Sequence, residues 1–157
     1  MVFLEKNKEL LGALLQSTAI LVGSLGVYAQ ISSSNASGQL ATATDLYDTY
    51  LEFAFDNPKY AENFDYLGPR VSKEENVKYT WYVSKLLFVS EEILKLSLDN
   101  ENKREWCETI FSQLEYHEQY LTSHDFSSHR GHYTSEITEM FDYFKLIEPK
   151  AKFDCHP

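Results

Sequence analysis

One long stretch of the chain has no charged side chain, and it limits what the whole molecule can be. It runs from Leu10 to Ile31 and reads LLGALLQSTAILVGSLGVYAQI. At 1.5 Å per helical residue, this stretch would extend roughly 33 Å, which matches a hydrocarbon core about 30 Å thick. A helix that is apolar on every side is rarely found in a small soluble domain. The sequence therefore predicts a transmembrane helix over 10–31, preceded by a short flank over 1–9.

The same segment also resembles a cleaved signal peptide. It has a basic start, an apolar middle and small residues at Val27 and Ala29, where a signal peptidase would recognise them. The apolar region of a signal peptide usually spans about 7–15 residues, so the greater length here favours a retained anchor. Recovery of Met1 on the mature protein would distinguish the two.

Small residues recur along the predicted span and indicate how it packs in lipid. They are Gly12, Ala19, Gly23 and Gly26. Small side chains let the backbones of membrane helices approach each other closely. We therefore expect this helix to associate with another membrane protein or with a second copy of itself.

The basic residues near the span indicate its orientation. Lys6 and Lys8 precede it, and the next basic residue along the chain is Lys59. Basic residues are enriched on the cytoplasmic side of membrane helices. This bias favours an N-terminus in the cytoplasm and a domain on the outer side of the membrane.

The charge of the chain excludes one large class of partners. It has 24 acidic and 14 basic residues, for a formal net charge of −10. Such a balance repels the phosphates of nucleic acids and of anionic lipid headgroups. Aromatic residues make up 15% of the chain, enough to build an apolar core and to argue against disorder. We expect a folded domain that does not bind nucleic acid.

The remainder of the chain has the periodicity of helices. Residues 32–39 are polar and form either a linker or a continuation of the span. A helix is predicted over 40–55, and Asn57 followed by Pro58 is typical of the start of a short helix. A capping box from Ser72 to Glu75 opens the longest and most central helix. Its apolar stripe comprises Tyr79, Tyr82, Leu86, Val89, Ile93 and Leu96, and Trp81, Leu87 and Phe88 are expected to widen it.

Two further helices complete the predicted domain. The first is capped at Asn102 and presents one face made of Trp106, Ile110, Leu114, His117 and Leu121. A polar loop over 123–133 separates it from the last helix, over 135–147, whose apolar face is Ile137, Met140 or Phe141, Phe144 and Ile147. The predicted fold class is all-α: a single N-terminal transmembrane helix, then a bundle over 40–148 of about four helices plus one short helix, then a frayed tail over 149–157.

Three segments of this domain resemble a known group of proteins. They are YLEFAFDNPKYAE from Tyr50 to Glu62, KYTWYVSKLLFVSEEIL from Lys78 to Leu94, and the helix that begins at Trp106. The pattern is similar to that of uncharacterised bacterial proteins with one N-terminal transmembrane helix and a small aromatic-rich helical domain. The resemblance implies this architecture and a bacterial cytoplasmic membrane, and it implies no catalytic residues.

Histidines provide the main candidate chemistry. Those at His124, His129 and His132, together with Asp125, are of the types that bind divalent metals. Their spacing matches no established metal motif, and a polar loop that contains histidines is the favoured interpretation. His117 lies on an apolar stripe and is expected to be a core histidine hydrogen-bonded to a neighbour. Glu91 and Glu92 lack the partner histidines of a di-metal bundle and are expected to be solvated.

The remaining motifs give no catalytic site. The sequence has no P-loop, no GxSxG and no GxGxxG. Cys107 and Cys155 are too few for a disulfide scaffold. Two unrelated thiols are the favoured interpretation, and a bond tying the tail to a helix in an oxidising compartment is the alternative.

These observations predict a non-catalytic, membrane-anchored helical protein without a cofactor. It would act as an interaction module or as an accessory subunit of a membrane assembly. The alternative is a periplasmic or secreted domain that binds a metal or small ligand through the histidine-rich loop.

Overall fold

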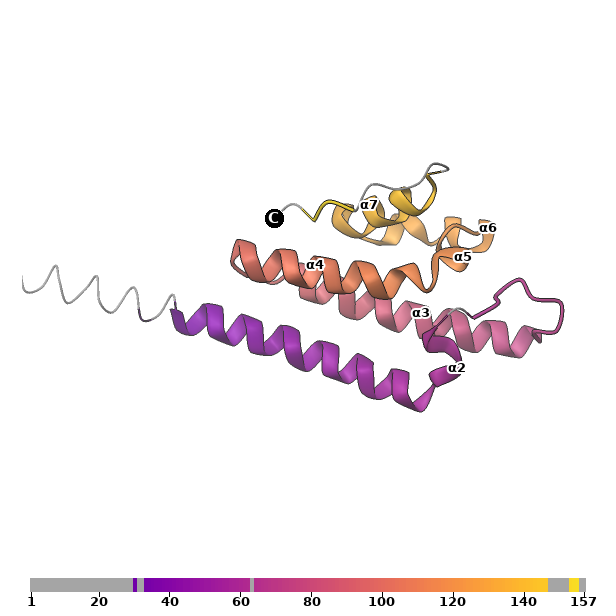
Figure 1. Cartoon of the computed structure of the whole chain (residues 1–157), viewed down its shortest axis with the longest axis horizontal. Coiled ribbons are helices and arrows are strands. Elements are labelled where there is room, and N and C mark those ends of the chain that lie inside the picture. Colours follow the sequence, from indigo (N-terminus) through magenta and orange to yellow (C-terminus); the bar gives the residue numbers. More distant parts are fainter. Residues whose placement is uncertain (1–29, 31–32, 63, 147–152, 156–157) are drawn as a thin grey trace, which may run out of the picture. The chain divides into compact units, whose positions relative to one another are not determined.

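The computed structural model describes residues 30, 33–62, 64–146 and 153–155, and Figure 1 shows their helices coloured along the chain. The chain divides into two units, residues 1–38 and residues 39–157. In the first unit the described residues, 30 and 33–38, are helical and exposed. In the second unit every regular element among the described residues is a helix, which confirms the all-α prediction.

The predicted membrane span cannot be compared with this structure. No helix in the described part of the chain is both long and apolar enough to cross a bilayer. Apart from residue 30, the span over 10–31 lies outside that part, and so do its packing residues Gly12, Ala19, Gly23 and Gly26.

The first described helix runs over residues 33–56, so most of the predicted linker is helical. Ala43 and Tyr50 are buried on its inner face, seven residues apart, which equals two helical turns. The helix ends before Asn57, whose side-chain amide donates a 2.9 Å hydrogen bond back to the carbonyl of Phe53. The amide therefore satisfies an otherwise unpaired carbonyl of the first helix. Asn57 is the N-cap residue of the short helix α2 (Pro58–Ala61) and Pro58 begins that helix, as the sequence predicted, but the Asn57 side chain makes no capping hydrogen bond to it.

The longest helix of the second unit is α3 (Lys73–Leu94), and it opens with the predicted capping box. The Ser72 hydroxyl accepts from the Glu75 amide, and the Glu75 carboxylate accepts from the Ser72 amide. Its buried face packs against α4 and α7, and Tyr82 contacts Tyr50 of the first helix. The predicted central position of this helix is therefore confirmed.

Removal of this cap should have a measurable and local cost. We expect Ser72→Ala to lower the free energy of unfolding by about 1 kcal/mol, because the Glu75 amide loses its acceptor. Ser112→Ala is a matched control. Its exposed hydroxyl bonds only to a carbonyl of its own helix, and its loss should change stability by less than about 0.5 kcal/mol. Urea unfolding curves measure both, and equal midpoints for the two variants would contradict the capping argument.

The next helix, α4 (Asn100–Glu115), differs from its prediction at both ends. It is capped by Asp99, whose carboxylate accepts from the Asn102 amide at 2.9 Å, so Asn102 is the donor and not the cap. It ends at Glu115, whereas the predicted apolar stripe continued to Leu121. The chain turns at His117, whose side chain lies in the core, and α5 (Glu118–Leu121) follows.

The segment predicted as a polar loop contains two short helices, α6 (His124–Ser127) and the 3₁₀ helix η1 (Arg130–His132). Phe126 is buried there and packs edge-on against Phe141 of α7 (Ser135–Phe144). The predicted inner face of α7 is confirmed for its four described residues, Ile137, Met140, Phe141 and Phe144. The structure thus has four long helices in its described part, namely residues 33–56, α3, α4 and α7.

The C-terminal segment is bound to the domain, which corrects two predictions. Cys107 of α4 and Cys155 form a disulfide, with sulfur atoms 2.07 Å apart, so they are not unrelated thiols. Two residues before that bond, Phe153 stacks on Phe111 with ring centroids 4.7 Å apart. Residues 153–155 are therefore part of the packed domain and do not form a frayed tail.

Candidate interaction surface

The main exposed feature of α3 is a row of apolar side chains. Val77, Trp81 and Phe88 expose 47%, 72% and 60% of their surface. They are four and seven residues apart, so at 3.6 residues per turn they lie on one face of the helix, together with the small Ser84. We call the set Val77, Trp81, Ser84 and Phe88 the aromatic face.

The aromatic face lies opposite the buried side of α3. Tyr82, Leu86 and Ile93, which represent the buried side, are shielded from solvent. The prediction that Trp81 and Phe88 widen the buried stripe was therefore wrong, although it was right for Leu87. The helix is apolar on two sides, and the domain covers only one of them.

The exposed aromatic area is comparable to the largest apolar patch of a typical monomer. A buried aromatic side chain removes about 150–250 Å² from water, so Trp81 and Phe88 together leave on the order of 300 Å² exposed. Contiguous apolar patches of about 300–600 Å² are often functional on a monomer. The aromatic face has the area and the chemistry of a contact surface.

Several charged groups near the aromatic face are paired within the domain. Lys78 binds Glu74 at 2.7 Å, and Lys95 binds Glu92 at 3.1 Å. The hydrogen bond from Lys78 lowers the pKa of the Glu74 carboxyl. Lys85 lies over the ring of Phe53 at 4.2 Å. The aromatic face is therefore bordered by lysines and glutamates, and most of those named here contact other residues of the same domain.

A groove of about 380 Å³ borders the aromatic face and contains two of the predicted metal ligands. It is lined by Thr80, Trp81, Ser84, Tyr120, Phe126, His129, His132 and Tyr133. The rings of His129 and His132 have centroids 6.1 Å apart. The structure thus brings these two histidines together beside the exposed indole of Trp81.

The other two predicted ligands do not complete a metal site. His124 and Asp125 belong to α6, and the Asp125 carboxylate accepts a 2.5 Å hydrogen bond from the Tyr66 hydroxyl. In the described part of the chain no three histidine, cysteine, aspartate or glutamate side chains form a group able to hold a metal ion. The four predicted residues are therefore not assembled into one centre.

His117 is a core histidine, as the sequence predicted. It is fully buried, and its Nδ1 atom shares a 2.9 Å hydrogen bond with the hydroxyl of Tyr79. Burial disfavours the charged imidazolium and lowers the pKa of His117 to about 4. Burial also raises the pKa of Tyr79, and that of Tyr120 to about 12. The side chains of His117, Tyr79 and Tyr120 are therefore neutral at physiological pH and pack in the core.

Glu91 differs from the solvated carboxylate that was expected. Its side chain is 13% exposed, and it accepts a 2.6 Å hydrogen bond from the amide of Thr134. Thr134 is the cap residue of α7, so Glu91 anchors the start of that helix to α3. Glu92 is half-exposed and pairs with Lys95.

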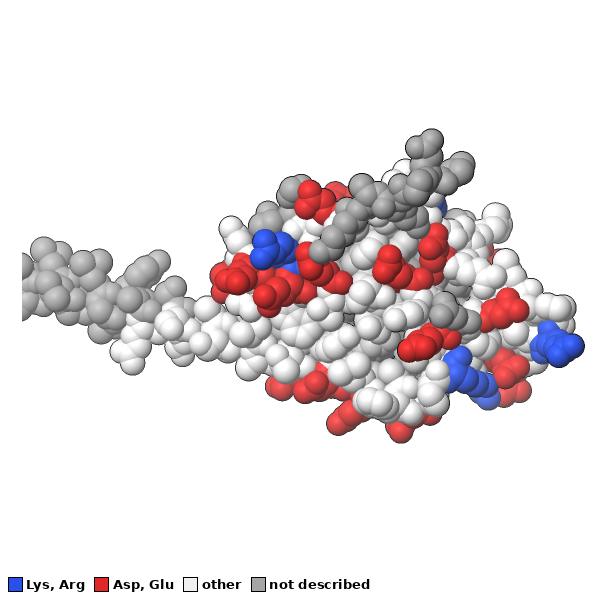
Figure 2. All heavy atoms as spheres, viewed as in Figure 1, with Lys and Arg blue, Asp and Glu red and all other residues white. Residues whose placement is uncertain are grey.

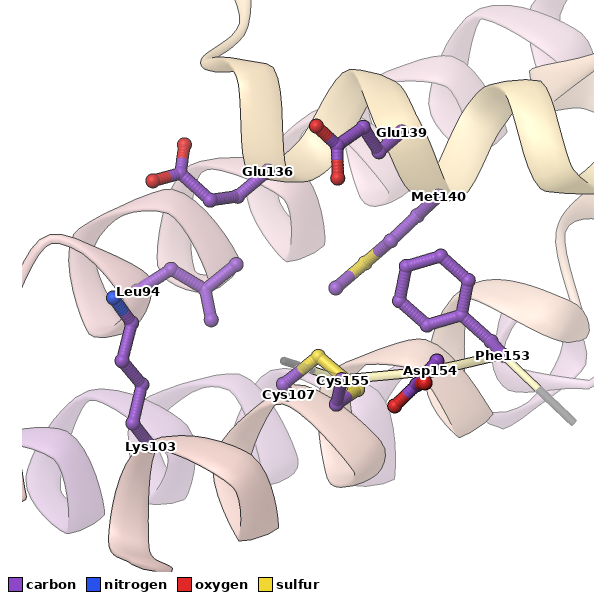
Figure 3. A pocket seen from close by; sticks show the side chains of 9 residues that line it. All are labelled: Leu94, Lys103, Cys107, Glu136, Glu139, Met140, Phe153, Asp154 and Cys155. Atoms are coloured by element: carbon purple, nitrogen blue, oxygen red, sulfur yellow. A yellow bond between two sulfur atoms is a disulfide. The ribbon is translucent and has the colours of Figure 1, made fainter. Parts of the chain in front are cut away.

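A second hollow, of about 100 Å³, lies beside the disulfide (Figure 3). The Cys107–Cys155 bond, Leu94 and Met140 line its apolar part. Its polar lining consists of Lys103 with three carboxylates, those of Glu136, Glu139 and Asp154. Figure 3 shows the two α7 glutamates on one side and Lys103 with the disulfide on the other. The hollow is small, and the C-terminal segment forms one of its walls.

No family model matches the chain, and no curated protein or solved structure matches it either. Its function has to be argued from the surfaces described above.

Proposed function

We propose that the chain is a non-catalytic accessory or interaction subunit, anchored in a membrane by residues 10–31 and contacting another protein through the aromatic face of α3. The observation that carries the proposal is the exposure of Trp81 and Phe88 on a helix whose opposite side forms the core. Leaving two large aromatic side chains in water is unfavourable, and a protein contact would remove that cost.

The disulfide supports the proposed position of the domain. Bonds such as Cys107–Cys155 persist in oxidising compartments and are rare in the cytosol. The lysines before the predicted span independently favour a cytoplasmic N-terminus, which puts the domain on the outer side. Two unrelated features of the chain therefore agree on an outward-facing domain.

The anchor is tested by extraction of membranes with alkaline carbonate. We expect the intact chain, with Met1 retained, to stay in the membrane pellet, because the uncharged segment prefers lipid to water. Recovery of the full chain in the supernatant would overturn the anchor, and recovery of a chain that starts after residue 29 would show a cleaved signal peptide.

The contact is tested by photo-cross-linking in the source organism. Phe88 is replaced by p-benzoylphenylalanine, and the matched control carries the same replacement at Phe55, which is 81% exposed on a different helix. We expect a protein adduct from position 88 and a weaker one or none from position 55. Adducts to lipid alone at position 88, or no adduct, would overturn the proposed contact.

A further inference from the structure

The groove beside Trp81 is lined by a buried tyrosine whose hydroxyl has no partner in the described part of the domain. Tyr120 is 5% exposed, and its ring packs against Phe126 and Tyr66, with ring centroids 5.4 Å and 4.9 Å away. Its hydroxyl, like that of Tyr133, forms no hydrogen bond to any residue that the structure describes. A buried tyrosine hydroxyl usually has a hydrogen-bond partner. The groove therefore presents two polar groups that a ligand can satisfy.

The other lining residues add further hydrogen-bonding groups. His129, His132 and Trp81 contribute two imidazoles and an indole N–H, whose nitrogen atoms also form no hydrogen bond to a described residue. The hydroxyls of Thr80 and Ser84 donate to carbonyls of α3 at 2.8 Å, and each still has lone pairs with which to accept. Seven of the eight described residues that line the groove therefore have a polar side-chain atom. Ligand pockets are usually lined mainly by apolar side chains, so this groove suits a ligand with many hydrogen-bonding groups.

The groove also differs in charge from the rest of the molecule. Among the described residues, those that line it include no lysine, arginine, aspartate or glutamate. Two carboxylates lie near Tyr120 and Tyr133, and both already accept hydrogen bonds from the domain, Asp125 at 2.5 Å and Glu91 at 2.6 Å. Figure 2 shows acidic side chains outnumbering basic ones over the visible face of the molecule. A chain with a net charge of −10 repels anions, and a cation finds no carboxylate in the described lining. The groove therefore favours an uncharged ligand.

The indole of Trp81 supplies a flat apolar surface beside these polar groups, and this side chain is 72% exposed. The face of an aromatic ring has partial negative charge, so it attracts the partly positive hydrogens of C–H groups. A sugar ring has such C–H groups on one face and hydroxyl groups around its edge. A flat aromatic ligand would stack on the same indole, but it would leave most of the polar lining without partners, which costs free energy once water is displaced.

We propose that this groove binds a neutral saccharide, with a C–H face of the sugar ring on Trp81 and its hydroxyls hydrogen-bonded to Tyr120, Tyr133 and the two histidines. The volume of about 380 Å³ lies at the low end of the range of about 300–1,000 Å³ for small-ligand sites, so a mono- or disaccharide unit fits. That unit is either a free sugar or the end of a larger glycan. The site goes beyond the proposed function, which concerns a protein contact and is tested at Phe88, outside the groove lining.

The test measures binding of the full chain, in detergent, to immobilised glycans. One set is neutral and ends in glucose, galactose, mannose or N-acetylglucosamine, and the other set is acidic and ends in sialic acid. We expect binding to at least one neutral glycan and none to the acidic set. Competition by the corresponding free monosaccharide would show that a single sugar is sufficient, and a lack of competition would assign the site to a longer glycan.

Three variants locate the binding in the groove. Trp81→Ala should weaken it about tenfold or more, because the stacking surface is lost. Tyr120→Phe should weaken it about fivefold through loss of one hydrogen bond, and it should leave the stability of the domain unchanged, because this hydroxyl has no partner among the described residues. Phe88→Ala is the matched control, since Phe88 is exposed on the same helix without lining the groove, and it should bind as the wild type does.

Three results would overturn the saccharide site. They are the absence of binding to every neutral glycan, stronger binding to the acidic set, and undiminished binding by Trp81→Ala. None of these results bears on the proposed function, because photo-cross-linking at position 88 tests that contact separately. Conversely, a failure of the cross-linking experiment leaves the glycan measurements and their interpretation unchanged.

Discussion

Replacing both cysteines, in the double variant C107S/C155S, should lower the free energy of unfolding by about 4 kcal/mol. The bond joins residues 48 positions apart in the sequence, and a cross-link over that separation removes much of the freedom of the unfolded chain. The variant also frees Phe153 from its position over Phe111, which adds a packing cost. Urea unfolding of the wild type and the variant measures the difference.

A reducing agent provides the control for this prediction. It should destabilise the wild type to a similar degree and leave the double variant unchanged, since the variant has no bond to reduce. If the wild-type curve does not respond to reduction, the two cysteines are not bonded in solution. That outcome would also remove one of the two arguments for a domain on the outer side.

Local sequence patterns predicted part of the core. The capping box at Ser72 was predicted residue by residue, and the inner face of α7 was predicted with Met140 and Phe141 as alternatives, both of which are buried. Each depends on interactions within about one or two turns of chain. The end of α4 was not predictable in this way. The stripe through His117 to Leu121 continues at helical spacing, but the chain turns at His117, whose buried side chain is hydrogen-bonded to Tyr79, 38 residues earlier.

Trp81 and Phe88 of the aromatic face were predicted to be buried but are exposed, and the reason is similar. Trp81 and Phe88 are apolar residues on a helix with a long apolar stripe, and spacing cannot tell an aromatic side chain that packs inward from one that stays exposed. Which side of α3 is covered depends on where α4, α7 and the first helix lie. The same limit applies to Cys155, because a partner 48 residues away leaves no local pattern.

The burial of His117 should make the domain lose stability in mild acid. Its pKa is lowered to about 4 in the folded chain, from a value near 6.5 in the unfolded chain. Between these two values the unfolded chain binds the proton and the folded chain does not, so stability rises with pH across that window. The contribution of His117 is fully present above about pH 6.5. It falls by about 3 kcal/mol as the pH is lowered to 4, and it levels off at lower pH, where His117 is protonated in the folded chain too.

Two variants isolate this contribution from the carboxylates that titrate over part of the same range. His117→Phe keeps a ring in the core and removes the titrating group, so its stability should depend less on pH between 4 and 6.5 than that of the wild type. Tyr79→Phe removes the hydroxyl bonded to Nδ1 and should keep most of the wild-type slope, because burial causes the pKa shift. Chemical unfolding at a series of pH values measures all three proteins. A His117→Phe curve parallel to the wild type would show that His117 is not held neutral by burial, and a Tyr79→Phe curve as flat as that of His117→Phe would assign the shift to the hydrogen bond.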